Sequence, residues 1–121
     1  MATICFYQDT RHEKTLHWIR DVLGIGYVSR RTDGMSELRV NGHIQIRDIL
    51  KKLQPFIRFK AVQAKSLIKA TEILSSAKFR MLDKKQLFSL VELALVMQRA
   101  NYVTKRKKTR EELCTALGLT P

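Results

Sequence analysis

The chain has 121 residues, enough for one hydrophobic core, and 23 lysines and arginines against 11 acidic residues give it a formal charge of +12. Such a charge favours a polyanionic partner, nucleic acid before an anionic membrane, without distinguishing duplex DNA from RNA. Two distant cysteines, three histidines outside zinc-finger spacing and the lack of any apolar run near 20 residues argue against a disulfide framework, a zinc site and a membrane span.

The first residues alternate in polarity, which predicts a half-buried strand over residues 2–8. Ile4 and Phe6 fall on one face, and the opposite face carries Thr3, Cys5 and Tyr7. A helix is expected next, because Thr10 and Glu13 have the spacing of a capping box. Its apolar stripe consists of Leu16, Ile19 and Leu23, and the helix is expected to end at Gly24.

A β-hairpin is predicted around Asp33 and Gly34, a dipeptide that favours tight turns. In the strand after the turn, Leu38 and Val40 point one way, and the other face carries Glu37 and Arg39. In the strand before the turn, one face carries Tyr27, Ser29 and Arg31. A β-ribbon with such a face can enter the major groove, where arginine pairs with guanine and glutamate accepts from cytosine. Exposed strand faces are also polar for solubility alone, so both interpretations stay open.

Helices follow in the second half of the chain. Residues 46–53 have amphipathic helical spacing and are followed by Pro55, which predicts a helix that ends there. The same spacing over residues 64–74 predicts a second helix, and a third is expected to begin near Asp83. This third helix runs through Leu87, Leu90, Val91 and Ala94. It is unusually apolar, so we expect other parts of the protein to cover most of its surface. Strand, helix, hairpin and then helices form an α+β pattern in a single domain, residues 1–121.

The last segment, residues 103–119, is predicted to be a basic loop followed by a short helix capped by Thr109 and Glu112. Its sequence KRKKTR holds five cations in six residues, which suits contact with nucleic-acid phosphates, although a solvated loop could have the same composition. No nucleophile elbow, phosphate-binding loop or HExxH motif is present. Capping and solvation explain the scattered acidic residues, so we identify no metal site in the chain.

Taken in order, four segments resemble the LAGLIDADG homing endonucleases, specifically the compact, homodimeric, intron-encoded type of algal organelles. The segments are LGIGYVSRR, LQPFIRFKAVQA, LIKATEILSSAK and TKRKKTREELCTALG, and their separations are close to those of the family. The resemblance covers nearly all of the chain. It implies an α+β fold in which an antiparallel sheet lies in the DNA major groove and helices pack on its other face.

The resemblance also implies roles for single residues. Lys60 matches a lysine beside the active site that stabilises charge on the cleaved phosphate or organises the attacking water. Gln8 matches a glutamine that holds active-site water, and His12 falls where the family usually has a basic residue. Without the resemblance, the pattern around Lys60 favours an ordinary surface lysine with a partly buried stem. The implied DNA contacts are Thr3, Cys5, Tyr7, Tyr27, Ser29, Arg30, Arg31, Glu37, Arg39, Lys105, Arg106, Lys107 and Lys108.

One part of the family pattern has no match. The signature helix, which supplies the dimer interface and the acidic metal ligand, would precede residue 1 together with the first strand and part of the second. Hydrolysis of this kind uses a divalent metal, Mg²⁺ by resemblance, and its carboxylate ligand is not among the matched residues. Without these elements a sheet edge and the core beneath it would be open, so we expect a homodimer, or a complementing chain that carries the helix.

These observations predict the double-stranded-DNA-binding component of a LAGLIDADG-type homing endonuclease, which cleaves a specific site only if the missing helix is supplied. The alternative is a catalytically inactive nucleic-acid-binding protein, such as a maturase-like intron-RNA binder, and a third possibility is a basic structural protein of a ribonucleoprotein. The expected location is intracellular, with no membrane attachment: a chloroplast or mitochondrion if the gene is organellar, otherwise the cytoplasm.

Overall fold

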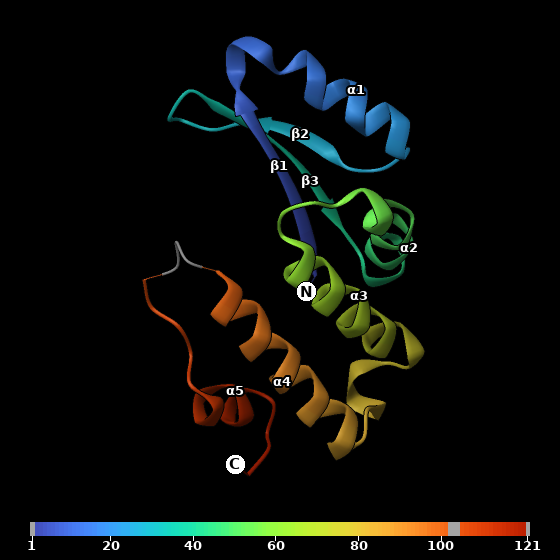
Figure 1. Ribbon diagram of the computed structural model, residues 1–121, viewed down its shortest axis with the longest axis vertical. Coiled ribbons are helices and arrows are strands. Elements are labelled where there is room, and N and C mark those ends of the chain that lie inside the picture. Colours follow the sequence, from blue (N-terminus) through green and yellow to red (C-terminus); the bar gives the residue numbers. More distant parts are fainter. Residues whose placement is uncertain (1, 102–104, 121) are drawn as a thin grey trace.

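The computed structural model describes residues 2–101 and 105–120 and has the predicted α+β architecture (Figure 1). A sheet with one helix beside it forms one end of the molecule, and the remaining helices extend from it. The elements are β1 (Thr3–Asp9), α1 (Lys14–Leu23), β2 (Tyr27–Arg30), β3 (Met35–Asn41), α2 (His43–Leu53), α3 (Ala61–Ser76), α4 (Lys84–Ala100) and α5 (Arg110–Ala116). The described residues also contain short 3₁₀ turns between these elements, namely η1 (Thr10–His12), η2 (Gln54–Phe56) and η3 (Phe79–Met81).

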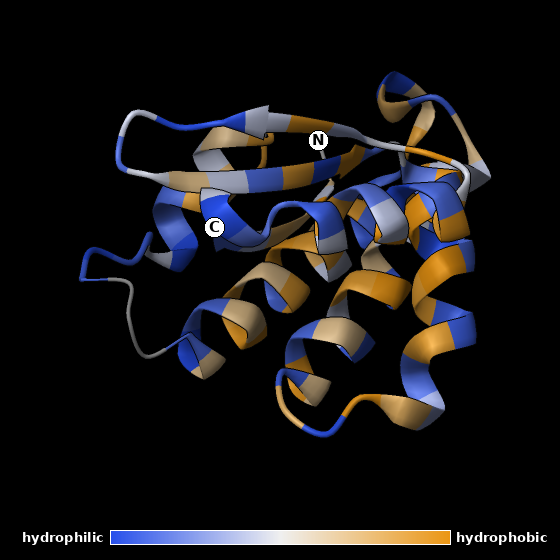
Figure 2. Cartoon of the chain, turned by 90° about the horizontal axis from the view of Figure 1, so that it is seen from above, coloured by the Kyte–Doolittle hydropathy of each residue, from blue (hydrophilic) through white to orange (hydrophobic). Residues whose placement is uncertain are grey.

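The described strands form one antiparallel sheet in the order β1-β3-β2, so the second strand of the predicted hairpin is central. The turn is closed by the Arg31 amide, which donates to the Met35 carbonyl at 2.7 Å, and by the Met35 amide, which donates to Asp33 Oδ1 at 3.2 Å. Polar and apolar residues alternate along the strands (Figure 2). Because the alternation is strict along β3, Leu38 and Val40 are completely buried on one face.

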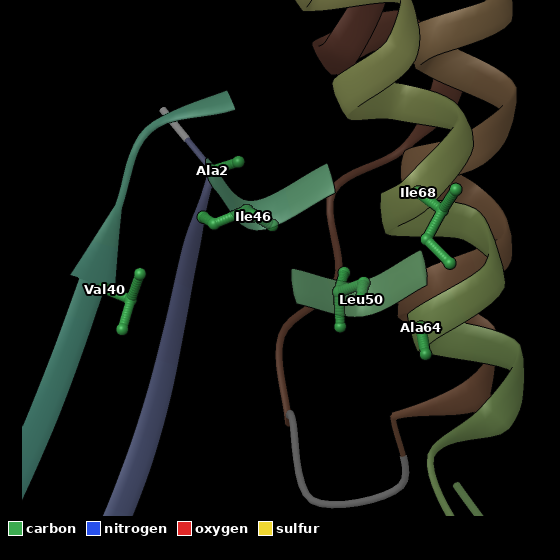
Figure 3. Packing of buried hydrophobic residues seen from close by; sticks show 6 residues of the cluster. All are labelled: Ala2, Val40, Ile46, Leu50, Ala64 and Ile68. Carbon is green, nitrogen blue, oxygen red and sulfur yellow. The ribbon is translucent and has the colours of Figure 1, made fainter. Parts of the chain in front are cut away.

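The main core lies where α2 is inserted between the sheet and α3 (Figure 3). Val40 of β3 and Ala2 lie on the sheet side, and Ala64 and Ile68 lie on α3. Ile46 and Leu50 of α2 are the buried residues that connect the two sides, as their four-residue spacing predicts. Full burial of a side chain such as Ile46 contributes about 1.5–3 kcal/mol, so this layer holds the sheet and the helices together.

The predicted capping box at Thr10 and Glu13 is wrong. Asp9 instead caps η1, because its Oδ1 accepts the Arg11 amide at 2.9 Å, and Glu13 precedes α1 without a side-chain capping bond. Tertiary contacts engage both side chains. The Thr10 hydroxyl lies 3.0 Å from the hydroxyl of buried Ser36, and the Glu13 carboxylate accepts from Ser36 at 2.8 Å. The predicted end of the helix is confirmed, since Gly24 adopts the left-handed conformation at φ 71°.

The expectation that α4 is well covered is also wrong. Among its described residues only Val91 is buried, in a small cluster with Cys114 and Leu119. Helix α4 packs against α3 on one side and against the short α5 on another, which leaves much of its apolar surface half exposed. The capping box of α5 is confirmed, because Thr109 and Glu112 each accept the other's backbone amide. Both cysteines are free thiols, and no helix in the described ranges is long and apolar enough to cross a membrane.

Candidate nucleic-acid interface

The face of the sheet away from Leu38 and Val40 gathers most of the predicted contact residues. Antiparallel pairing sets them in two rows across the three strands. Cys5, Arg39 and Tyr27 form one row, and the neighbouring row consists of Tyr7, Glu37 and Ser29. Since cross-strand partners lie about 4.5–5.5 Å apart, the two rows make one continuous surface of hydroxyl, thiol, carboxylate, guanidinium and aromatic groups.

The arginines on this surface are held by neighbouring acids. Arg39 Nη2 donates to Glu37 Oε1 at 3.1 Å, and Arg31 Nη2 lies 3.1 Å from Asp33 Oδ2. The Arg31 guanidinium also lies over the ring of Tyr7, 5.7 Å from its centroid. The Glu37 carboxylate raises the pKa of Arg39, and a hydrogen bond with Cys5 raises the pKa of Tyr7. These side chains are therefore positioned before any ligand binds, although their charge is largely balanced.

Arg30 lies on the opposite side of the sheet. Successive residues of β2 alternate between the two faces of the sheet. Ser29 pairs with Glu37 of β3, and Arg30 pairs with Ser36. There it forms a bidentate ion pair with Glu13, at 2.6 Å from Nη2 to Oε1 and 3.0 Å from Nε to Oε2. Arg30, one of the implied DNA contacts, therefore lies on the other face of the sheet from Arg39, because strand alternation places adjacent residues on opposite faces.

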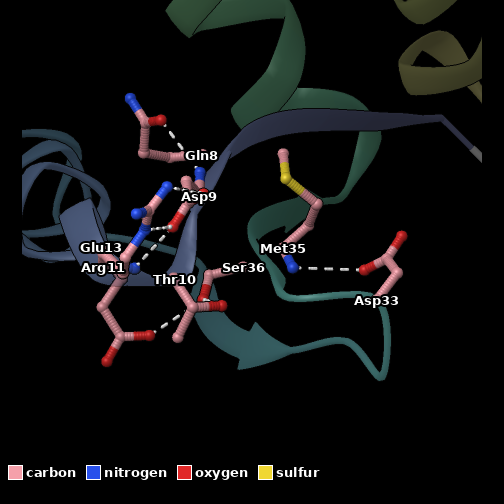
Figure 4. Close-up of polar contacts among 8 residues, drawn as sticks. All are labelled: Gln8, Asp9, Thr10, Arg11, Glu13, Asp33, Met35 and Ser36. Carbon is pink, nitrogen blue, oxygen red and sulfur yellow. Dashed lines mark hydrogen bonds and ion pairs between the residues drawn. The ribbon is translucent and has the colours of Figure 1, made fainter.

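The Glu13 carboxylate is the centre of a polar network between α1 and the sheet (Figure 4 shows it beside Thr10 and Ser36). Hydrogen bonds from Arg30 and then from Ser36 lower the pKa of Glu13 to about 2, and its side chain is only 17% exposed. Sequence spacing does not reveal this network, because it joins residues 13, 30 and 36 through tertiary contacts. A glutamate close to a predicted helix start is the only signal in the sequence.

Replacement of Glu13 by glutamine tests this network. The folded-state pKa is depressed from 4.5 to about 2, so the carboxylate stabilises the wild type above about pH 4.5, and this contribution is lost as the pH falls through about 2. We expect Glu13→Gln to lower the free energy of unfolding at pH 7 and to remove that part of the acid sensitivity. Urea unfolding at pH 7, 4.5, 3 and 2 measures both effects. The exposed Asp21→Asn is the matched control, and equal pH profiles for the two variants would contradict the prediction.

The predicted catalytic residues come from two places in the fold. Gln8 lies at the end of β1, where its Oε1 accepts the Asp9 amide at 2.9 Å, and His12 follows on η1. Lys60 directly precedes α3 and has φ 63°, an uncommon backbone conformation for a residue other than glycine. Sequence order separates Lys60 from the other two, so their approach depends on tertiary packing. Within residues 2–101 and 105–120 there is no cluster of three or more His, Cys, Asp or Glu suited to a metal ion.

The side chain of Gln98 anchors the basic loop to α4. Gln98 accepts the Lys108 amide at 2.8 Å and donates to the Lys108 carbonyl at 3.1 Å. The five cations of KRKKTR are exposed; Arg110, which begins α5, forms an ion pair with Glu92 of α4, and Arg106 lies 3.7 Å from Glu112 Oε1. Residues 103 and 104 of the predicted segment lie outside the described residues. Gln98 is a contributor that the sequence does not reveal, because only the fold brings it next to the loop.

A second feature without a signal in the sequence patterns is an apolar surface beside Lys60. The exposed fractions of Phe56 and Phe59 are 78% and 84%, and Val62, in the first turn of α3, is 52% exposed. Single exposed apolar residues are ordinary, but three within seven positions concentrate apolar surface in one short segment, and concentrated apolar surface is typical of interaction sites.

Several known proteins are similar to this chain in sequence and in fold, although no family model matches its sequence. The chain is 34% identical over 107 residues to the DNA endonuclease I-CvuI of Chlorella vulgaris, an alignment that covers 88% of this chain and 62% of that protein. The chain thus spans about three fifths of the relative's length. Crystal structures of the homing endonuclease I-CvuI, bound to DNA targets in the presence of Mg or Ca, have a TM-score of 0.75 with this chain at 28% identity. Each superposition includes 98% of this chain and 75% of the I-CvuI chain.

Two more distant structures share the fold. The homing endonuclease I-TnaI has a TM-score of 0.74 at 18% identity, with 95% of this chain and 75% of that chain covered. An archaeal intron-encoded homing endonuclease complexed with DNA has a TM-score of 0.79 at 17% identity, with 96% and 74% covered. The arrangement of one antiparallel sheet and its helices is therefore common to all of these proteins.

Proposed function

We propose that this chain, which resembles the LAGLIDADG homing endonucleases in sequence and in fold, is the double-stranded-DNA-binding component of a site-specific endonuclease. The observation that carries the proposal is the pair of side-chain rows on the exposed face of the sheet. In the relative I-CvuI, with the same fold, the solved complexes contain target DNA. Residues 1–121 act in this proposal as one DNA-binding domain, with the basic loop and C-terminal helix at 103–119.

Charge is divided between two surfaces in a way that supports separate tasks. On the sheet, the charges of Arg31 and Arg39 are balanced by acidic partners. These arginines therefore supply hydrogen-bond donors with a fixed direction but add little net positive charge to the surface. In the loop, Lys105, Lys107 and Lys108 are exposed and take part in no ion pair of the described residues, and this is the arrangement that attracts phosphates. We infer that the loop positions the duplex and that the sheet reads base edges.

Selection of ligands tests this function directly. The purified chain is incubated with a randomised duplex library, a structured-RNA pool and random-sequence DNA at the same salt concentration. We expect enrichment of a defined duplex site whose affinity exceeds that of the RNA pool. Equal or tighter binding of structured RNA would instead support the maturase-like or ribonucleoprotein alternatives.

For cleavage, we infer that Lys60 stabilises charge on the phosphate or organises the attacking water and that Gln8 holds active-site water, with His12 at the position where the family usually has a basic residue. The left-handed backbone of Lys60 supports a functional role, because such conformations cluster at active sites. A Mg²⁺ ion prefers oxygen ligands, and these three residues supply no carboxylate. The nearby Asp9 carboxylate is engaged by Arg11, at 3.0 Å in two places, so it does not fit as the ligand. We propose that the metal ligand comes from a signature helix on another segment or chain.

A polypeptide of residues 1–121 alone is therefore expected not to cut DNA. Incubation with Mg²⁺ and a plasmid library that carries randomised sites should leave every plasmid intact, because the carboxylate that binds the metal is not supplied. Gel analysis of plasmid topology is the measurement, and a complete family endonuclease is the positive control. Reproducible cleavage by homogeneous protein that disappears in Lys60→Ala would sink the idea.

The apolar surface formed by Phe56, Phe59 and Val62 leads to a proposal about association. We propose that it is covered in the functional assembly by a second copy of the chain or by the complementing chain. Sedimentation at micromolar concentrations should show self-association, weakened about tenfold or more in Phe59→Ser, because that ring is 84% exposed in the single chain. Trp18→Ser, on the 64% exposed Trp18 of α1, is the control. A stable monomer that unfolds cooperatively at all these concentrations would contradict the proposal.

A further inference from the structure

A second cationic surface lies away from the sheet, at the turn that joins α3 to α4. Figure 1 shows this turn, coloured yellow, at the end of α3 that is remote from the strands. Residues 78–88 include η3 and the first turn of α4. The segment has one acidic residue, Asp83, and four cations, Lys78, Arg80, Lys84 and Lys85.

The charge of this turn is not compensated. None of its four cationic side chains takes part in an ion pair within residues 2–101 and 105–120. The Asp83 carboxylate is occupied in capping α4, where it accepts the Gln86 amide at 2.8 Å. This differs from the sheet face, where Arg31 and Arg39 each have an acidic partner. The turn therefore attracts a polyanion from outside the chain.

Exposed apolar side chains lie between these cations and just after them in the sequence. Phe79 is 52% exposed, Met81 70% and Phe88 36%, whereas Leu82 between them is 8% exposed and anchors the turn. Exposed phenylalanine rings beside cations provide two different contacts, a flat apolar face and a positive charge. Proteins that bind single strands combine these two contacts, because bases stack on the rings and phosphates pair with the cations.

We propose that the α3–α4 turn binds single-stranded nucleic acid, with Phe79 and Phe88 as stacking residues and the four cations as phosphate contacts. A duplex does not fit this chemistry, because its bases are already stacked and unavailable to the rings. A lipid surface fits less well, since membrane-bound helices present a continuous apolar face and here cations separate the apolar residues. The proposal concerns a surface other than the sheet and does not depend on the duplex-binding function.

The decisive variant is Phe79→Leu combined with Phe88→Leu, which keeps apolar area but removes the planar faces. We expect its affinity for a fluorescently labelled 20-residue oligodeoxythymidine to fall about tenfold or more, with an unchanged thermal unfolding midpoint. Lys78→Gln with Arg80→Gln should flatten the log-log salt dependence by roughly 0.7 for each lost contact. Lys65→Gln with Lys69→Gln, on exposed positions of α3, is the matched charge control and should change neither property.

Three outcomes would overturn the proposal. Unchanged oligonucleotide affinity in the double leucine variant would exclude stacking. Loss of oligonucleotide binding in Arg31→Ala with Arg39→Ala would show that the strand occupies the sheet. Binding to phosphatidylserine vesicles that the leucine variant retains, together with weak oligonucleotide binding, would identify a lipid surface. Because the sheet and the turn are altered separately, failure of duplex binding leaves this test valid.

Discussion

Neutralisation of the basic loop, by glutamine at Arg106, Lys107 and Lys108, is expected to weaken binding to every duplex by about the same factor. Each lost phosphate contact lowers the slope of log affinity against log salt by roughly 0.9, so three contacts correspond to about two to three orders of magnitude at 0.1 M salt. The side chains reach solvent from a loop that Gln98 anchors through backbone bonds, so their replacement should leave the fold intact. Titrations of several duplex sequences at two salt concentrations measure the effect.

The control for this loop variant carries the same loss of charge elsewhere. Glutamine at Lys78, Arg80 and Lys84 removes three cations from the α3–α4 turn, remote from the sheet. We expect duplex affinity to change far less in this control than in the loop variant. If both variants weaken duplex binding equally, the loss of affinity comes from the lower net charge of the molecule, and the loop does not contact the phosphates specifically.

Replacement of Arg39 by alanine is expected to change which duplex is bound, more than how tightly duplexes are bound in general. Arg39 lies in the centre of the sheet face, between Cys5 and Tyr27, and Glu37 holds its guanidinium. A bidentate contact with a base is worth about 5- to 150-fold in discrimination against the wrong base, and it adds little to the salt dependence. We therefore expect preference to relax at one or two positions of the site with an unchanged salt slope, and the same for Arg31→Ala.

Arg30→Ala is the matched control for this prediction, because Arg30 is the neighbouring arginine of β2 but lies on the other face. It should reduce stability through the loss of its ion pair with Glu13, without altering sequence preference. Affinity measurements over a library of site variants decide between the faces. A uniform decrease in both Arg31→Ala and Arg39→Ala, with preference unchanged, would mean that the hairpin does not read bases.

Sequence patterns alone predicted the elements that depend on neighbouring residues. The hairpin at Asp33 and Gly34, the end of α1 at Gly24 and the capping box of α5 follow from turn and capping chemistry, which acts over a few residues. Period-two alternation by itself places Arg39 and Leu38 on opposite faces of the sheet, and the burial of Leu38 confirms it. The fold class and most of the sheet surface could therefore be predicted.

Tertiary structure decided where local rules compete with distant partners. Glu13 leaves its expected capping position because Arg30 and Ser36 offer stronger donors to its carboxylate, and no pattern near residue 13 contains them. The coverage of α4 depends on the packing of α3 and α5, which its own apolar composition does not specify. Charge shows the same division: sequence reveals how many cations a segment has, but only the fold shows which have acidic partners. Arg39 of the sheet is held by Glu37, whereas Lys78 of the turn forms no ion pair with the part of the chain that the structure describes.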